Sequence, residues 1–263
     1  MLHPSAIAAG VRIVAHETVG STNAEALALA RTGERGPVWV TAARQTSGRG
    51  RRGRVWVSEP GNLYATLLLV DACSIARVPE LSFVAALALH DAVAEAAPEL
   101  AARLSLKWPN DLLADRAKLA GVLAESENLA SGGFSSVLGF GLNCAHHPDG
   151  TAYVTTDLRA LGFRVTPDKL LHALSGSMVA RLARWDRGSG FAAIRRDWLA
   201  RAGGIGEPIR VRTAQAQVEG VFSTLDPTGR MILAANDGST HVIGAGDVLP
   251  IEPLAPQPIQ VAP

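Results

Sequence analysis

The spacing of apolar residues divides the chain into helical and extended stretches. Three segments carry apolar side chains every three or four residues, which predicts helices that each cover a face of a sheet. These segments run from Pro79 to Ala97, from Thr166 to Trp185, and from Phe191 to Ala202. Prolines stand near the predicted starts of the first two, where the missing N–H would have no helical partner anyway.

A shorter helix is predicted within the stretch GSTNAEALALARTG, residues 20–33. Thr22 and Glu25 have the spacing of a capping box, Asn23 is a further cap candidate, and Gly33 stands where a helix stops. The sequence therefore predicts a polar cluster of Ser21, Thr22 and Asn23 at a helix N-terminus.

The extended stretches form two groups. Runs at 38–43 and 63–70 predict neighbouring strands of one sheet, joined by an arginine-rich loop. Four further runs, at 104–108, 110–113, 118–126 and 135–143, are separated by short turns. Because short connections favour antiparallel pairing, these four predict a meander. The expected fold class is α+β, with a mixed, largely antiparallel central sheet flanked by helices.

The texture changes after Gly206, where at least four short alternating strands follow one another. This part is too short for a β-sandwich, and it predicts a small β-barrel. We therefore expect a large domain over 1–204, a small C-terminal β-barrel domain over 205–252, and a frayed proline-rich tail over 253–263.

Composition and charge exclude several classes of protein. Hydrophobic residues make up 48% of the chain and charged residues 19%, as in ordinary globular proteins. The formal net charge of +1 indicates no polyanion partner, so any anion binding must be local. Cys73 and Cys144 have no CxxC spacing, which favours free thiols in a reducing compartment. No targeting segment or long apolar run is present, so we expect a cytoplasmic protein without membrane contact.

The stretch RQTSGRGRRGR, residues 44–54, holds five arginines and three glycines and no acidic residue. Glycines let backbone N–H groups converge on one point, and arginines offer planar donor forks, so the loop suits a phosphate or a carboxylate. A solvated basic loop and a nucleic-acid contact are the alternatives. Dispersed basic residues elsewhere and a single nearby aromatic, Trp56, weaken the nucleic-acid interpretation.

Two further motifs could carry chemistry. Lys107 and Lys118 lie on predicted strands on either side of tight turns, where each could either reach solvent or enter a ligand pocket. The turn at 108–111 could be merely rigid. Glycines alternate in GFGLN, residues 139–143, which would let a flat ligand lie against the backbone or would mark a bend in the strand.

Taken together and in order, GSTN, RQTSGRGRRGRVW, GNLYATLLL, LKWPNDLLADRAKLAGVL and GFGLN resemble the catalytic core of the biotin protein ligases. The motifs cover roughly residues 15–145, and the small C-terminal β-domain extends the resemblance. The resemblance implies a core like that of class II aminoacyl-tRNA synthetases and an SH3-like C-terminal barrel. It also implies that biotin and ATP form biotinyl-5′-AMP and pyrophosphate, and that the biotinyl group then passes to a lysine of a biotin carboxyl carrier protein domain.

The resemblance also implies site residues, with Mg²⁺ accompanying ATP although no ligand cluster identifies its site. The residues with implied catalytic roles are Lys118, Arg51 and Asp111. The implied biotin-binding residues are Ser21, Thr22, Asn23, Gln45, Gly48, Arg49, Gly50, Arg51, Lys118, Gly121 and Gly139. The implied residues for ATP and the adenylate are Arg49, Arg51, Arg52, Arg54, Trp56, Lys107, Asn110, Lys118, Gly141 and Asn143.

By the same resemblance, the loop arginines contact the biotin carboxylate and the adenylate phosphate, and loop closure shields the anhydride from water. Lys118 would stabilise charge on the reacting phosphorus, and Asp111 would orient or deprotonate the incoming lysine.

Larger members of the family carry an N-terminal DNA-binding domain. Only about fourteen residues precede the first core strand here, so we expect a monofunctional ligase, monomer or homodimer, with no nucleic-acid partner. A lipoate or octanoate ligase of the same fold and a nucleic-acid-binding module are the alternatives.

Overall fold

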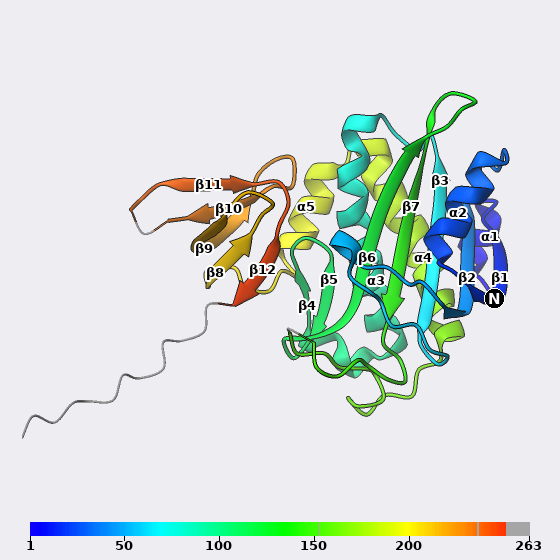
Figure 1. Cartoon of the computed structure of the whole chain (residues 1–263), viewed down its shortest axis with the longest axis horizontal. Coiled ribbons are helices and arrows are strands. Elements are labelled where there is room, and N and C mark those ends of the chain that lie inside the picture. The colour runs from blue at the N-terminus through cyan, green and yellow to red at the C-terminus, as the bar shows by residue number, and fades with distance from the viewer. Residues whose placement is uncertain (152, 236, 251–263) are drawn as a thin grey trace, which may run out of the picture. The chain divides into compact units, whose positions relative to one another are not determined.

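The computed structural model describes residues 1–151, 153–235 and 237–250. The chain divides into two compact units, Met1–Gly203 and Gly204–Pro263, and each unit has its own sheet (Figure 1). The predicted tail at 253–263 lies outside the described residues.

A seven-stranded sheet forms the centre of the N-terminal unit, in the order β1-β2-β3-β7-β6-β5-β4. β1 and β2 are parallel, and the other neighbouring pairs are antiparallel. The strands are β1 (Arg12–Val19), β2 (Val38–Gln45), β3 (Leu63–Val70), β4 (Leu104–Lys107), β5 (Asp111–Ala114), β6 (Ala117–Asn128) and β7 (Phe134–Leu142). The strands from β4 to β7 form the predicted meander, and the predicted α+β fold class is confirmed.

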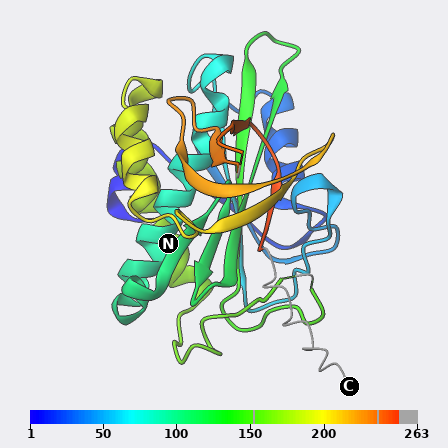
Figure 2. The same ribbon diagram turned by 90° about the vertical axis from the view of Figure 1, so that its left-hand side faces the viewer.

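Helices cover both faces of this sheet (Figure 2). On one face α2 (Thr22–Arg31) packs against β2, β3 and β7. On the other face lie α3 (Leu81–Ala96) and α4 (Pro167–Trp185), and α5 (Phe191–Leu199) packs on both. A short α1 (Pro4–Ala8), which the apolar spacing did not predict, packs on α4. Short 3-10 turns lie at Arg51–Gly53, Ile75–Glu80, Pro98–Arg103 and Asp186–Gly188.

Two predicted helix starts are corrected by the structure. Pro79 lies in a separate 3-10 turn, and α3 begins after it at Leu81. Ser21 is the N-cap of α2, so the capping box proposed for Thr22 and Glu25 does not form. The reason is that Thr22 directs both its N–H and its hydroxyl to the side chain of Gln45 instead.

β3 is buried on both faces, which explains its nearly continuous apolar sequence LYATLLLV. On the face that α2 covers, Leu68 packs with Val38, Val40 and Val137 of the neighbouring strands and with Ala26 of the helix. Thr66 lies on this same strand, fully buried and polar. The core thus continues up to the N-terminus of α2 and there gives way to a buried polar layer.

The C-terminal unit is a five-stranded antiparallel sheet in the order β11-β10-β9-β8-β12. Its strands are β8 (Pro208–Arg212), β9 (Gln217–Leu225), β10 (Met231–Ala234), β11 (Thr240–Ile243) and β12 (Asp247–Pro250). Val211, Phe222, Met231 and Leu233 form its buried apolar side. Burial raises the pKa of Asp226, but hydrogen bonds from Thr228 and Arg230 outweigh burial and lower this pKa to about 2.

Both cysteines are free, as the sequence predicted, and both are buried. Burial raises the pKa of the Cys144 thiol to about 12, so this thiol stays protonated at neutral pH. Among the described residues, every helix is too short or too polar to cross a bilayer.

Candidate active site

Gly121, Gly139 and Gly141 form a glycine patch on the face of the sheet that carries α2. Gly139 of β7 is paired with Leu123 of β6 and with Thr66 of β3, and Gly141 of β7 is paired with Gly121 of β6. A Cβ at Gly139 would collide with the Asn23 side chain, and a Cβ at Gly141 would lie 2.5 Å from the Trp56 ring. The glycines therefore let these two side chains lie directly against the strand backbone.

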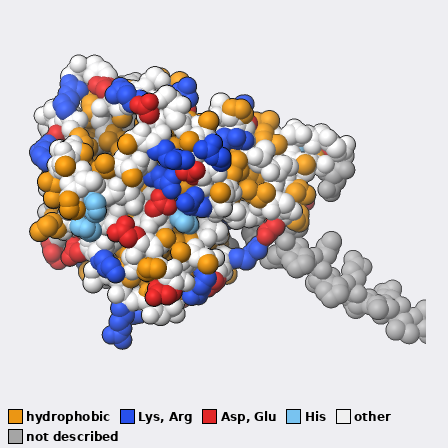
Figure 3. Space-filling model, turned by 180° about the vertical axis from the view of Figure 1, so that it is seen from behind, with side chains coloured by type: hydrophobic (Ala, Val, Ile, Leu, Met, Phe, Trp, Pro, Cys, Tyr) orange, Lys and Arg blue, Asp and Glu red, His pale blue; other side chains and the backbone are white. Residues whose placement is uncertain are grey.

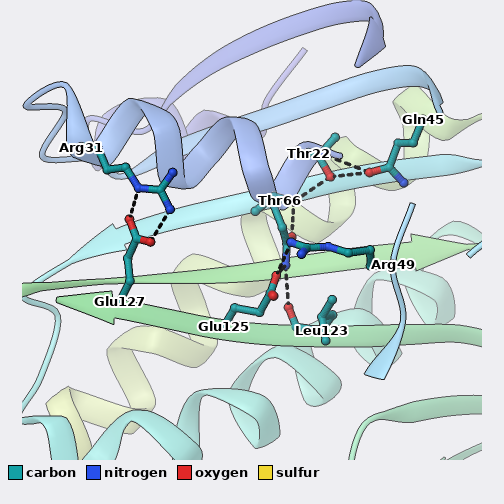
Figure 4. A network of polar contacts seen from close by, with 9 residues as sticks. Thr22, Arg31, Gln45, Arg49, Thr66, Leu123, Glu125 and Glu127 are labelled. Atoms are coloured by element: carbon teal, nitrogen blue, oxygen red, sulfur yellow. Dashed lines mark hydrogen bonds and ion pairs between the residues drawn. The ribbon is translucent and has the colours of Figure 1, made fainter. Parts of the chain in front are cut away.

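Neutral polar side chains gather at the N-terminus of α2 (Figure 4). The Gln45 carboxamide oxygen accepts hydrogen bonds from the Thr22 N–H at 2.8 Å and from the Thr22 hydroxyl at 3.1 Å, and its NH₂ group donates to Ser58 Oγ at 2.9 Å. Gly48 fits tightly against Ser58 and Gln45, and a Cβ there would collide with Ser58 Oγ. The first turn of α2 is thereby tied to the end of β2 and to the arginine loop.

Asn23 lies deeper in the same layer and is only 3% exposed. The Thr66 hydroxyl lies 2.8 Å from Thr22 Oγ1 and 2.7 Å from Asn23 Oδ1. The Asn23 NH₂ group donates to the Glu125 carboxylate at 2.7 Å and to the Leu123 carbonyl at 3.2 Å. The side chains that α2 and Gln45 contribute to this layer are uncharged, and the Glu125 carboxylate beside them is paired with Arg49, so the layer suits an uncharged polar ligand group.

The arginine loop is a folded turn that joins β2 to β3. Its backbone closes through a hydrogen bond from the Gly50 N–H to the Arg54 carbonyl at 2.7 Å and another from the Trp56 N–H to the Gly48 carbonyl at 2.9 Å. Arg52 has a φ of 56° at the tip, a conformation that few non-glycine residues adopt. Arg52 and Arg54 are exposed there.

Two arginines of the loop reach side chains on the meander. Arg49 Nη2 lies 3.4 Å from the Glu125 carboxylate, and Arg51 Nη1 donates to Asn110 Oδ1 at 3.1 Å. Asn110 in turn donates to the Val122 carbonyl at 2.6 Å. The loop therefore reaches the residue before β5 through Arg51 and reaches β6 through Arg49.

Lys118 occupies the centre of the site and is 13% exposed. Its ammonium lies 2.7 Å from Asp111 Oδ1, 5.4 Å from the centre of the Trp56 ring and 5.1 Å from the centre of the Tyr153 ring. A carboxylate and two aromatic faces thus hold one cation in place. A Cβ added at Gly121 would lie 3.4 Å from the ammonium of this lysine, so the glycine leaves room beside it.

The indole N–H is the one polar group of the Trp56 side chain. Its Nε1 is buried and has no hydrogen-bond partner among the residues that the structure describes. Buried donors nearly always have a partner, so this N–H is a candidate contact for a bound ligand. The indole spans the space between Lys118 and Gly141, which places that contact at the centre of the site.

The predicted site residues differ in their position relative to the glycine patch. Asn23, Trp56 and Lys118 lie against the glycine patch, and Ser21 is buried as the N-cap of α2, whereas Arg52 and Arg54 are exposed at the tip of the loop. Lys107 pairs in register with Asp111 at the end of β4. Asn143 is 3% exposed and donates to the Thr156 carbonyl at 3.0 Å, so its amide fixes the chain after β7.

Sequence reasoning missed three residues of this layer, namely Thr66, Glu125 and Tyr153. Thr66 could have been found as the one aliphatic hydroxyl in a strand whose other residues are apolar or aromatic. Glu125 and Tyr153 gave no such signal, because their contacts are with residues about 100 and 35 positions away along the chain.

Metal ligands are sparse in the described parts of the chain. No group of three His, Cys, Asp or Glu side chains lies close enough there to hold a metal ion. Basic and acidic side chains are interspersed on the face shown in Figure 3, without a continuous basic stripe. The five arginines of the stretch 44–54 form a local cationic feature in a chain whose formal net charge is +1.

The arginine loop, the lysine held by a carboxylate and two aromatic rings, and the polar layer of α2 thus lie around one patch of glycines, where anionic and uncharged polar groups of a ligand could both be bound. The model of the biotin/lipoate A/B protein ligase family matches residues 18–143, and that of the biotin protein ligase C-terminal domain matches residues 204–249. The chain therefore belongs to the biotin protein ligases, as the motifs predicted.

Individual relatives agree with this assignment. A biotin–[acetyl-CoA-carboxylase] ligase of Paracoccus denitrificans is 43% identical over 87% of this chain and 96% of its own length. The Mycobacterium tuberculosis protein of the same name is 36% identical over 88% of this chain and 85% of its own length. The fold matches that of the Aquifex aeolicus biotin protein ligase solved with biotin and ATP, with a TM-score of 0.77, 23% identity, and coverage of 90% of this chain and 97% of that one.

Proposed function

We propose that this protein is an ATP-dependent ligase that activates biotin as biotinyl-5′-AMP and transfers it to a lysine of a biotin carboxyl carrier protein domain. The observation that carries the proposal is the setting of Lys118, a cation held by the Asp111 carboxylate and the rings of Trp56 and Tyr153 beside the glycine patch. The relatives named biotin–[acetyl-CoA-carboxylase] ligases support the choice of substrate and partner.

In the first step a biotin carboxylate oxygen attacks the α-phosphorus of ATP, and the bond to the β-phosphate oxygen breaks. Both reactants are anionic, so the cations beside them must offset their repulsion and the charge that builds on phosphorus. We assign Lys118 and Arg51 to this role, with Arg49, Arg52 and Arg54 on the same loop holding the phosphates and the carboxylate. The products are the mixed anhydride and pyrophosphate.

In the second step the amine of the carrier lysine attacks the anhydride carbonyl, AMP leaves, and an amide forms. That amine must first lose a proton, because only the neutral form is nucleophilic. Asp111 is our candidate to orient the amine or to accept this proton. Its ion pair with Lys118 supports the assignment, because ligand contacts to Lys118 would release the carboxylate.

We assign the biotin ureido ring to the neutral pocket of Ser21, Thr22, Asn23 and Gln45. A ureido group needs donors and acceptors without a charge, which this pocket supplies. The backbone at Gly48, Gly50, Gly121 and Gly139 would allow close approach.

We assign the nucleotide to the neighbouring end of the patch. Trp56, Lys107, Asn110, Gly141 and Asn143 are the candidate contacts besides the loop arginines, and the unpartnered Trp56 N–H supports this. Mg²⁺ would enter with ATP, held chiefly by the phosphates, because the described residues offer no cluster of metal ligands. A cytoplasmic location, a monomer or homodimer, and a catalytic domain at 1–204 with a small C-terminal domain at 205–252 complete the proposal.

Pyrophosphate release tests this function. The protein is incubated with Mg²⁺ and ATP, together with biotin, lipoate or octanoate in separate reactions. Of these three reactions, we expect pyrophosphate release only in the one that contains biotin. Release with lipoate or octanoate but not with biotin would reassign the enzyme to the other activities of its family. Tight DNA or RNA binding that weakens steeply with salt would instead favour a nucleic-acid module.

A further inference from the structure

Glu125 connects two parts of the site that are far apart in the sequence (Figure 4). It lies on β6, with its side chain 32% exposed. The same carboxylate oxygen, Oε2, lies 2.7 Å from Asn23 Nδ2 and 3.4 Å from Arg49 Nη2. One acidic side chain therefore contacts both the neutral pocket of α2 and the cationic loop.

The contact with Asn23 fixes the orientation of a buried amide. Both N–H bonds of the Asn23 NH₂ group are used, one by Glu125 and the other by the Leu123 carbonyl. Its Oδ1 lies 2.7 Å from the Thr66 hydroxyl. A reversed amide would bring Oδ1 against the Glu125 carboxylate, and two acceptors would repel each other. The carboxylate thus leaves Asn23 with one acceptor lone pair to offer and no N–H to donate.

The contact with Arg49 holds the loop in place without a ligand. Arg49 and Glu125 are both partly exposed, at 48% and 32% of their side chains, so their ion pair is weak. A weak pair suits a loop that must move, because a substrate carboxylate or phosphate can replace Glu125 at little cost. The same loop is also anchored by Arg51 on Asn110.

Glu127 provides a matched comparison on the same strand. It lies two residues after Glu125, so both side chains point to the same face of β6. Glu127 also pairs with an arginine, Arg31 of α2, through two hydrogen bonds of 2.5 and 2.8 Å (Figure 4). It contacts neither Asn23 nor the arginine loop. Replacement of Glu127 therefore removes an ion pair from β6 without removing the contacts with Asn23 and Arg49 that Glu125 makes.

From these contacts we propose that Glu125 is a positioning residue for biotin binding. It fixes Asn23 as a hydrogen-bond acceptor for a ureido N–H, and it holds the arginine loop over the pocket until a ligand anion replaces it. The substrate part of this inference rests on the proposed function, whereas the anchoring of the loop does not.

Calorimetry tests the part played by Asn23. Glu125→Ala removes the acceptor for the Asn23 NH₂ group, and we expect it to weaken biotin binding about tenfold, the scale of one lost hydrogen bond. Glu125→Gln keeps a carboxamide oxygen in the same position and should recover most of that affinity. Glu127→Gln should bind biotin like the wild type. Unchanged affinity in Glu125→Ala, or an equal loss in Glu127→Gln, would overturn the proposal.

Limited trypsin digestion of the ligand-free protein tests the anchoring of the loop. Cleavage after the arginines at 49–54, followed by mass spectrometry, should be about two- to fivefold faster in Glu125→Gln, in line with a weak ion pair. Glu127→Gln should match the wild type. Equal loop cleavage in all three proteins would overturn the anchoring. If the wild type bound no biotin, the proposed function would fail, but this digestion would still decide whether Glu125 holds the loop.

Discussion

Lys118 Nζ lies 2.7 Å from Asp111 Oδ1, on the adjoining strands β6 and β5. The pair depends on a shift of strand register between Leu112 and Leu113, which leaves one extra residue on β6. Strict alternation would place Lys118 and Gly121, three residues apart, on opposite faces of the sheet. The bulge brings both to the face that carries the site.

Replacement of Lys118 tests its electrostatic role. Lys118→Ala should reduce the rate of biotin-dependent pyrophosphate release by roughly a hundredfold or more, the scale of one lost charge-stabilising donor in such a site. The measurement is steady-state pyrophosphate release at saturating biotin and ATP. Arg103→Ala is a suitable control, because that arginine pairs with Asp115 in a separate surface contact. Release from Lys118→Ala at the wild-type rate would remove this lysine from the mechanism.

Arg51 tests whether the loop retains the reactive intermediate. Arg51→Ala loses the contact with Asn110 but should keep the fold, because the side chain lies in a loop at the edge of the site. We expect biotinyl-5′-AMP to leave the enzyme faster, as measured by chasing labelled adenylate with unlabelled biotin. Arg12→Ala is the control, since Arg12 lies outside the stretch 44–54 and pairs with Glu34 on the surface. An unchanged lifetime of the bound adenylate would contradict loop closure.

Gly139→Ala tests the close approach of Asn23 to the sheet. The added Cβ would collide with Asn23 Oδ1 and displace the amide from Thr66 and Glu125. We expect calorimetry to show biotin affinity at least tenfold lower. Gly244→Ala is the control, because its Cβ would meet nothing closer than 4.0 Å and its φ is ordinary. Equal affinity in the two variants would mean that the packing of Asn23 on Gly139 has no part in binding.

The low pKa of Asp226 predicts a pH-dependent contribution to the stability of the C-terminal unit. A carboxyl whose pKa is about 2 in the folded state and about 3.9 when unfolded stabilises the fold above pH 4. That contribution disappears as the pH falls towards 2. Asp226→Asn should therefore lower stability by about 1–2 kcal/mol at pH 7 and by much less at pH 2. Calorimetric melting across this range checks the prediction, and a difference independent of pH would contradict it.

The fold was predictable wherever short connections and regular spacing determine the pairing. The meander from β4 to β7 is of this kind, because each strand pairs with the next. The pairing of β3 with β7 was not predictable from local pattern, since the two strands lie about 65 residues apart. The cap of α2 was mispredicted for a related reason, because the preference of Thr22 for Gln45 depends on tertiary structure.

The sequence indicated candidate site residues only where they lie in recognisable motifs. Lys118, Asp111 and the loop arginines lie in recognisable sequence motifs. Alternation alone would have put Lys118 and Gly121 on opposite faces of the sheet, because it takes no account of the bulge. Glu125 lies only seven residues after Lys118, yet its partners Asn23 and Arg49 come from other segments. Such contacts are set by sheet pairing and loop folding, which no local pattern encodes.

Calorimetric titration of biotin, with and without a non-hydrolysable ATP analogue, tests the central claim most directly. If the neutral pocket binds the ureido ring and the loop cations let two anions share one site, biotin should bind in a one-to-one ratio. The analogue should leave that binding intact or tighten it. Failure of biotin to bind, or its displacement by the analogue, would contradict the account.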